Sequence, residues 1–126
     1  PFPVYAIDYV SDEKQMARLY NAVDAYVTPS LEDNLPNTIV EALSCGVPCV
    51  GFNVGGIPEM IDHRKNGYLA EARNAEDLAE GIRFILETAS REELSAHAVH
   101  SALANYGETN VASKYIAVYK RASEKR

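Results

Sequence analysis

Apolar residues follow two patterns along this chain, and the two patterns alternate. Short runs rich in β-branched, aromatic or other apolar residues are typical of strands; they cover residues 4–7, 25–28, 48–52 and 68–69. Elsewhere apolar residues return every three or four positions, which is typical of helices; these stretches cover residues 11–23, 38–45, 58–61 and 74–86, a stretch from residue 90, and about 108–126. The alternation predicts an α/β fold, a Rossmann-like parallel sheet with flanking helices.

End signals and inner faces support these helices. Ser11 and Asn74 stand where an N-cap accepts hydrogen bonds from first-turn amides, Ser90 opens a capping box, and Gly46 is a natural C-terminal cap. We expect apolar side chains at helical spacing to face the core. These are Met16, Leu19, Tyr20 and Val23 in the first helix, Leu78, Ile82, Ile85 and Leu86 in the fourth, and Val111, Tyr115, Val118 and Ala122 in the last.

The loops over residues 29–37 and 53–57 are the first places to look for a ligand. In a parallel sheet, ligands bind at the carboxyl ends of the strands, in the strand-to-helix loops. The first loop enters a helix whose amides around Asn37 to Val40 have no intrahelical acceptor and carry the positive end of the helix dipole, which suits a phosphate. Thr38 could add a hydroxyl donor, and Asp33 and Glu41 bracket this position.

Glu41 stands among apolar neighbours, which are Ile39, Val40, Ala42 and Leu43. A carboxylate buried there needs hydrogen-bonding partners, and sugar hydroxyls are suitable because each carboxylate oxygen accepts from an O–H. The alternative is that Glu41 lies on the solvent edge of an amphipathic helix, which is the commoner position for a lone glutamate.

A longer stretch carries a family signature. Asp33 is followed by seven residues, then Glu41, then the run Ala-Leu-Ser-Cys-Gly-Val-Pro over 42–48. This resembles the signature of the retaining GT-B glycosyltransferases of family 4, the group 1 nucleotide-sugar transferases. Their signature is Glu, seven residues and Glu, followed by Ala, small or apolar residues, Gly, any residue and Pro. Further landmarks of the family resemble residues 24–30, 55–61, 66–69 and 75–79, in that order.

The resemblance implies a role for each matching position. Glu41 would bind the ribose hydroxyls of the nucleotide, and Asp33 the hydroxyls of the donor sugar. Backbone amides of the intervening segment would approach the sugar and the diphosphate; this segment is Asn34, Leu35, Pro36, Asn37 and Thr38. Two departures stand out: Asp33 is one methylene shorter than the commoner Glu, and Pro36 has no N–H to donate. Glu32 could take the role of Asp33.

Gly55 and Gly56 are weaker candidates for the same site. They could form a backbone nest beside the ligand, or only a tight turn that needs a positive φ angle. The matching family motif favours counting them as donor-binding residues.

Composition and charge exclude several classes of protein. The chain has 126 residues, of which 47% are apolar and 24% charged, and this is ordinary for one globular domain. A net charge of −6 argues against a nucleic-acid partner. Residues 19–63 contain no Lys or Arg, although a diphosphate needs cationic help. The resemblance places those cations, and the acceptor site, in segments that would precede Pro1.

We therefore interpret residues 1–126 as a single partial domain, the C-terminal portion of a glycosyltransferase donor-binding domain. The full-length enzyme is expected to transfer a hexosyl-type sugar from a nucleotide-diphosphate-sugar donor to a sugar or lipid-linked acceptor, with retention of anomeric configuration, in polysaccharide or glycolipid biosynthesis. We expect no metal and no other cofactor, and a cytoplasmic enzyme that is peripheral at the inner membrane face.

Two other classes stay open, and one further property is expected. A nucleotide-sugar epimerase of the same architecture, which is an isomerase, would bind a similar donor. A non-enzymatic α/β receiver or interaction domain would need a cluster of acids at the ends of early strands and a Lys at a late strand end, and no such Lys is found. If the chain is a partial domain, the sheet edge that the missing units would cover is expected to be exposed, so we expect the fragment to self-associate.

Overall fold

The computed structural model describes residues 3–7, 10, 12–32, 37–107 and 110–124. Within these ranges three strands form one parallel sheet in the order β1–β2–β3. Strand β1 covers Tyr26–Thr28, β2 covers Cys49–Phe52 and β3 covers Gly67–Ala70. The register pairs Tyr26 with Cys49, and Cys49 with Gly67. Each strand lies in an apolar run of the sequence, so the predicted α/β fold with a parallel sheet is confirmed.

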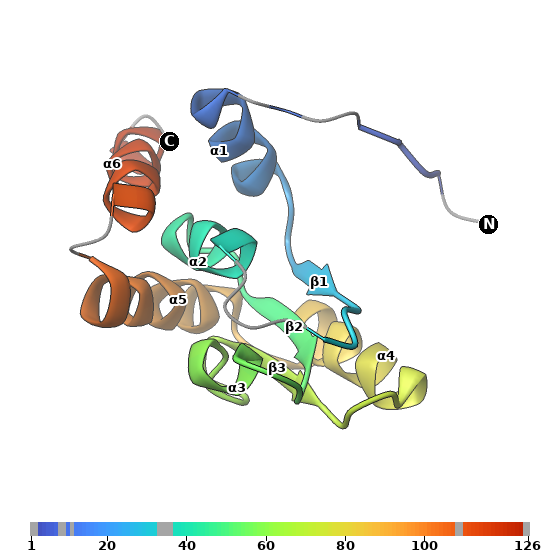
Figure 1. Cartoon of the computed structure of the whole chain (residues 1–126). Helices are drawn as coiled ribbons and strands as arrows, with labels where there is room; N and C mark the ends of the chain where they lie inside the picture. Colours follow the sequence, from blue (N-terminus) through green and yellow to red (C-terminus); the bar gives the residue numbers. More distant parts are fainter. Residues whose placement is uncertain (1–2, 8–9, 11, 33–36, 108–109, 125–126) are drawn as a thin grey trace.

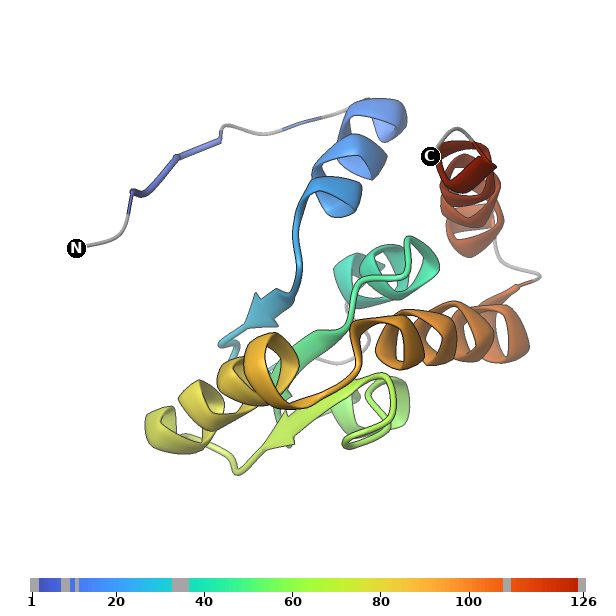
Figure 2. The same ribbon diagram turned by 180° about the vertical axis from the view of Figure 1, so that it is seen from behind.

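The helices cover both faces of this sheet (Figures 1 and 2). Their bounds are α1 Glu13–Ala22, α2 Asn37–Ser44, α3 Ile57–Met60, α4 Ala75–Arg83, α5 Arg91–Tyr106 and α6 Asn110–Glu124, with a π-helical turn at Phe84–Thr88. Helices α2 and α3 lie on one face, with α5 and α6 packed outside α2, and α4 lies on the other face. Within the described ranges, no helix has both the length and the apolar character that a bilayer span requires.

The core divides into two clusters because successive strand residues point to opposite faces. Cys49 joins the larger cluster, in which Ile39 and Leu43 of α2 meet Ile57 and other apolar side chains. Val50, the next residue of β2, joins the smaller cluster beneath α4. All four residues of β2 are buried, as expected for a central parallel strand covered on both faces.

The helix ends follow the predicted chemistry at several positions. Asn74 caps α4 by accepting from the Asp77 amide at 3.0 Å, and Ser90 caps α5 by accepting from the Glu93 amide at 3.4 Å. The cap of α1 is Asp12, which accepts from the Lys14 amide at 3.0 Å. Ser11, the predicted cap, lies outside the described residues. Of the predicted inner face of α6, Tyr115 is buried and Val118 half-buried. The side chains of Val111 and Ala122 are outside the description.

The predicted strand over residues 4–7 is wrong. These residues form no strand, and the side chains of Val4 and Tyr5 are 88% and 82% exposed. Figures 1 and 2 show the segment extending away from the sheet. Strand propensity is realised only where a neighbouring strand supplies hydrogen bonds and a packing surface, and no described strand lies beside this segment.

Two residues expected on inner helix faces are exposed instead. Val23 is 39% exposed because α1 has already ended at Ala22. Leu86 is 56% exposed, whereas its neighbour Ile85 is buried. Both Ile85 and Leu86 belong to the π-helical turn, whose wider i→i+5 winding rotates the side chains relative to α-helical spacing. The spacing of apolar residues in the sequence does not predict this change from α-helical to π-helical winding.

The C-terminal end of α2 depends on Gly46, as the sequence predicts. Gly46 has a φ of +72°, a left-handed conformation that costs side-chain-bearing residues free energy. A Cβ at this position would lie 2.6 Å from Ser95 Oγ and 2.8 Å from Tyr119 Cε2. The Ser95 hydroxyl donates to the Gly46 carbonyl at 2.8 Å, which ties α5 to the end of α2.

Gly46→Ala should therefore lower the free energy of unfolding by about 1–3 kcal/mol, because alanine takes on the backbone strain and crowds two side chains. Urea denaturation measures this change. Ser95→Ala removes the nearest crowding atom, so the loss in the double variant should be smaller than the sum of the two single losses. A Gly46→Ala chain as stable as the parent would contradict this account of the helix end.

Candidate functional site

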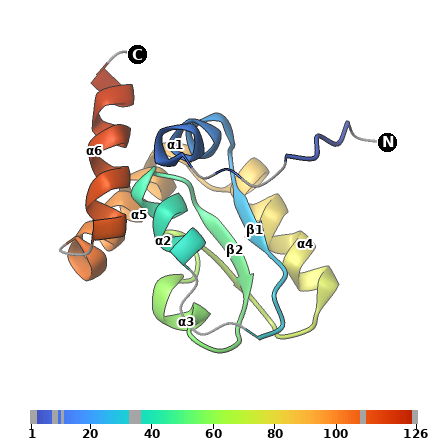
Figure 3. The same ribbon diagram turned by 45° about the horizontal axis from the view of Figure 1, so that its top comes forward.

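The loops that follow β1 and β2 leave the sheet at the same edge, the carboxyl edge of the parallel strands (Figure 3). The first loop connects Thr28 to α2, and the second connects Phe52 to α3. This placement matches the prediction from the strand–helix order. The structure therefore brings the start of α2 and the Gly55–Gly56 turn to one edge of the sheet, where ligands of parallel sheets bind.

The first turn of α2 presents an exposed backbone to this edge. Asn37 and Thr38 are both exposed, whereas Ile39 and Val40, which follow them, are buried. The first amides of a helix lack intrahelical acceptors and carry partial positive charge, so they can donate to an anion. The predicted residues Asp33, Asn34, Leu35 and Pro36 lie outside the described residues. Glu32, the alternative to Asp33, is described and is exposed.

Glu41 is half-buried on α2 and has a protein partner. The Tyr20 hydroxyl, from α1, donates to Glu41 Oε2 at 2.8 Å. Tyr20 is only 4% exposed, and the rings of Tyr26 and Tyr115 meet it edge-on with centroids 6.0 Å and 5.9 Å away. Glu41 is thus not fully solvated, as the alternative interpretation would have it. Its buried part is compensated by a hydrogen bond from Tyr20.

Burial and the Tyr20 hydrogen bond act on the pKa of the Glu41 carboxyl in opposite directions. Burial raises its pKa above the ordinary value, the Tyr20 hydrogen bond lowers it, and the charge of Glu13 raises it further. Burial, together with the hydrogen bond to Glu41, also raises the pKa of Tyr20 far above its ordinary value. Tyr20 therefore remains the donor and Glu41 the acceptor.

The geometry of the Gly55–Gly56 turn is compatible with both a tight turn and a backbone nest. Gly55 has a φ of +53°, so the tight turn does require a left-handed residue. Gly56 follows in the right-handed helical region, at the N-cap of α3. A left-handed and a right-handed residue in succession also provide the geometry of an anion-binding nest.

The cations nearest in sequence to this site point elsewhere. The Arg64 guanidinium lies over the Phe84 ring, 5.0 Å from its centroid, and Lys65 Nζ is 3.9 Å from Asp62 Oδ2. Both are exposed, as predicted for the turn over 63–67. Among the described residues, no group of three or more His, Cys, Asp or Glu side chains is arranged to hold a metal ion.

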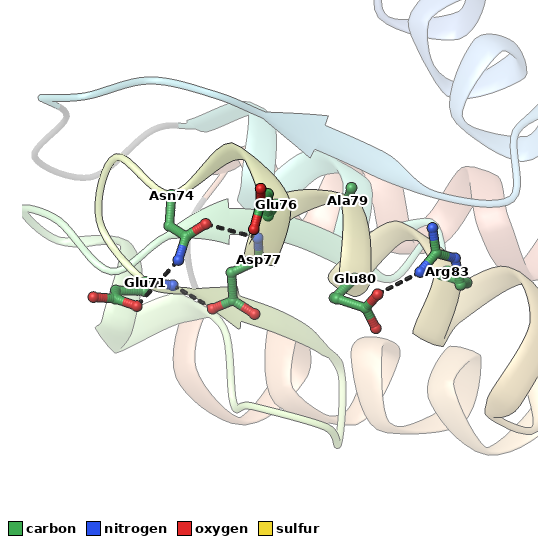
Figure 4. Close-up of a pocket in the computed structure, with 7 residues that line it drawn as sticks. All are labelled: Glu71, Asn74, Glu76, Asp77, Ala79, Glu80 and Arg83. Carbon is green, nitrogen blue, oxygen red and sulfur yellow. Dashed lines mark hydrogen bonds and ion pairs between the residues drawn. The ribbon is translucent and has the colours of Figure 1, made fainter.

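A separate open hollow of about 610 Å³ lies beside the start of α4 (Figure 4). Its lining residues are Glu71, Asn74, Glu76, Asp77, Ala79, Glu80 and Arg83. Asp77 accepts from the Glu71 amide at 2.7 Å and from the Tyr68 hydroxyl at 2.6 Å. The polar groups of the hollow thus organise the end of β3 and the start of α4. The negative charge of the hollow disfavours an anionic ligand.

Sequence reasoning assigned Tyr20 to the core and missed its contact with Glu41. The two residues are 21 positions apart and lie on different helices. An apolar stripe that includes a tyrosine predicts where the ring packs, but it gives no signal for the partner of the hydroxyl.

Comparison with known proteins defines the class. The fold is an α/β sheet of the kind that forms part of GT-B glycosyltransferases. Residues 4–101 match the family described as "Glycosyl transferases group 1", and this chain belongs to that family. The family resemblance in the sequence is thereby confirmed.

Individual relatives extend the match in sequence and in structure. N,N'-diacetylbacillosaminyl-diphospho-undecaprenol alpha-1,3-N-acetylgalactosaminyltransferase of Campylobacter jejuni is 32% identical over 117 residues, which are 92% of this chain and 31% of that protein. The structure of sucrose-phosphate synthase from Thermosynechococcus elongatus aligns with a TM-score of 0.69 at 23% identity, over 89% of this chain and 28% of the synthase. Anabaena HepE, solved in complex with UDP, aligns with a TM-score of 0.66 at 24% identity, over 86% and 28%. The chain thus spans less than a third of these relatives.

The raised pKa of Glu41 makes its ionised form costly to the fold. A carboxyl whose pKa is higher in the folded than in the unfolded chain destabilises the fold above that pKa, and this cost disappears below the unfolded value. Glu41→Gln keeps an oxygen that accepts from Tyr20 but removes the charge. We predict that Glu41→Gln melts at a higher temperature than the parent at neutral pH, that the difference shrinks as the pH falls through the raised pKa of Glu41, and that it is lost below the unfolded value of about 4.

Thermal melts across this pH range measure the difference. Glu92→Gln, at an exposed first-turn position of α5, is the control for simple loss of a charge. A Glu41→Gln chain that is less stable than the parent at neutral pH would show that the ionised carboxylate stabilises the fold.

Proposed function

We propose that this chain is the C-terminal portion of a donor-binding domain, and that the full-length enzyme transfers a hexosyl-type sugar from a nucleoside-diphosphate sugar to an acceptor, with retention of configuration. The observation that carries the proposal is the half-buried carboxylate of Glu41 on the same helix as the exposed first turn at Asn37 and Thr38. Its position in the family signature, and the UDP held by Anabaena HepE, support a nucleotide ligand.

Each part of this edge has a chemical task in the proposal. The first amides of α2, at Asn37 and Thr38, bind the diphosphate together with the helix dipole. The Gly55–Gly56 turn adds amides beside it. Glu41 accepts from the ribose hydroxyls, and Asp33 binds the donor sugar. Asn34, Leu35 and Pro36 belong to the segment whose backbone is proposed to approach the sugar and the diphosphate.

These groups act by orientation and electrostatics. Donors that are already aimed at the leaving diphosphate stabilise the charge that develops as the glycosidic bond breaks. Carboxylates that hold the ribose and the sugar fix the donor in one pose. No step assigned to these residues requires a metal or another cofactor.

The charge pattern supports a site that this chain supplies only in part. Residues 19–63 contain no Lys or Arg, and the chain as a whole carries a net charge of −6. A bound diphosphate needs charge-assisted partners in addition to backbone amides. We propose that the cations, the base-binding pocket and the acceptor site lie in the parts of the relatives that this chain does not match.

The family also favours a transferase over the epimerase and receiver alternatives. The name of the Campylobacter jejuni relative specifies a diphospho-undecaprenol compound. This supports a sugar or lipid-linked acceptor and a role in polysaccharide or glycolipid biosynthesis. A lipid-linked acceptor would in turn place a cytoplasmic enzyme at the inner membrane face.

Nucleotide titrations followed by amide NMR test the proposed site. We expect millimolar affinity because the site is partial, so each nucleotide is added up to about 10 mM. The nucleotides are UDP, GDP, ADP and TDP, and they should shift the amides of Asn37, Thr38, Gly55 and Gly56. Glu41→Ala should weaken the affinity for the best nucleotide roughly tenfold, because it leaves ribose hydroxyls without an acceptor.

Inorganic diphosphate and Glu92→Ala are the matched controls. Inorganic diphosphate should shift the α2 amides, but its affinity should not depend on Glu41, since it has no ribose. Glu92→Ala should leave nucleotide affinity unchanged. Shifts confined to other regions, or equal affinities for the parent and Glu41→Ala, would refute the assignment.

The isolated chain should not transfer sugar. Release of nucleoside diphosphate from UDP-, GDP- and ADP-sugars, with simple sugars as acceptors, should equal the protein-free rate, because the cations and the acceptor site are proposed to lie elsewhere. Turnover that depends on the 126 residues and is lost in Glu41→Ala would show that the site is complete in this chain.

A further inference from the structure

The hydrogen bond from Tyr20 to Glu41 joins a buried aromatic cluster to the candidate site. The donor is a hydroxyl on a ring that is 4% exposed, and the acceptor is a carboxylate on a half-buried side chain. The bond is 2.8 Å long and connects α1 to α2. A buried tyrosine usually directs its hydroxyl to a partner, and here that partner is a candidate binding residue.

The packing of Tyr20 fixes the direction of this hydroxyl. The ring meets Tyr26 of β1 and Tyr115 of α6 edge-on, at interplanar angles of 67° and 74°. Edge-to-face contacts of this kind hold aromatic rings in defined orientations. The hydroxyl therefore acts as a fixed donor beneath Glu41, which would otherwise sample several side-chain rotamers.

A carboxylate can satisfy two partners at once. Each oxygen of an ionised glutamate accepts hydrogen bonds, so a donor on Oε2 leaves Oε1 for another hydroxyl. We propose that Tyr20 is a positioning residue for the donor site, which holds Glu41 through Oε2 so that Oε1 accepts from a ribose hydroxyl. This inference rests on the proposed function of Glu41.

The groups around Glu41 define what a pH measurement reports. The charge of Glu13 of α1, which is paired with Lys114 of α6 at 3.0 Å, acts on the Glu41 carboxyl, and the charge of Glu41 in turn acts on Tyr115 of α6 and Cys45 of α2. Burial raises the pKa values of Tyr115 and Cys45 to about 12, so both stay neutral at working pH. Neither of them adds a charge at the site, and the charge of Glu13 acts there by raising the pKa of Glu41.

Tyr20→Phe tests the positioning role because it keeps the ring and removes the hydroxyl. UDP affinity at neutral pH should fall about three- to tenfold, the range expected when one hydrogen bond is lost. Loss of the bond also raises the pKa of Glu41, so the acidic limb of the binding profile should move to higher pH. A purely structural tyrosine would change melting temperature without moving that limb.

Tyr115→Phe is the matched control, because it removes a hydroxyl from the same aromatic cluster and no hydrogen bond from Tyr115 to Glu41 is found among the described residues. Its UDP affinity and acidic limb should match those of the parent. If Tyr20→Phe does not fold, Tyr20→Met fills the space with a flexible apolar side chain and takes its place.

The outcomes separate this inference from the function on which it rests. If Glu41→Ala weakens UDP binding but Tyr20→Phe leaves both the affinity and the acidic limb unchanged, the positioning role is overturned and the assignment of Glu41 stands. If Glu41→Ala also binds UDP like the parent, the assignment of Glu41 fails and the positioning role fails with it.

Discussion

The burial of α2 is the constraint on which the rest of the structure depends. This helix contacts β2, α5 and α6, and five of its eight residues are buried. Glu41 is its single charged residue, and it is accommodated because α1 supplies the Tyr20 hydroxyl. Helices α1, α5 and α6 thus hold in place a helix whose first turn lies open at the carboxyl edge of the sheet. The stability of the fold and the geometry of the candidate site are consequences of the same packing.

This arrangement places a cost and a function on the same side chain. A partly desolvated carboxylate disfavours its own charge, and a shape-matched neutral residue would pack there more easily. A carboxylate at such a position fits a group that takes a second partner, besides Tyr20, from a ligand. The absence of Lys and Arg from residues 19–63 adds a second imbalance in the same region. In a larger site at the carboxyl edge of the sheet, ribose hydroxyls would compensate the carboxylate of Glu41. Cations from the rest of the protein would compensate the lack of Lys and Arg.

The sequence predicts most of the fold because its elements are short and strongly patterned. The runs that become β1, β2 and β3 are apolar, and Gly46 has the positive φ angle that its place after a helix requires. The segment over 4–7 is exposed and is not the predicted strand, because strand propensity does not show whether a partner strand is present. Leu86 is exposed and does not lie on the predicted inner helix face, because the π-helical turn departs from the α-helical winding that the periodicity assumes. At the candidate site, the family signature predicts a binding role for Glu41, but its hydrogen bond with Tyr20 could not be predicted, because it joins two helices that are distant in sequence. The role of Asp33 stays a prediction, because it lies outside the described residues.

The most direct measurement of the central claim compares UDP with its 2′,3′-dideoxy analogue in the parent chain and in Glu41→Ala. If Glu41 accepts from the ribose hydroxyls, removing those hydroxyls should weaken binding to the parent roughly tenfold and should have little further effect in Glu41→Ala. This non-additivity is specific to a direct contact, since two independent losses would multiply. Equal losses in the parent and in the variant would contradict the proposal that Glu41 binds the ribose.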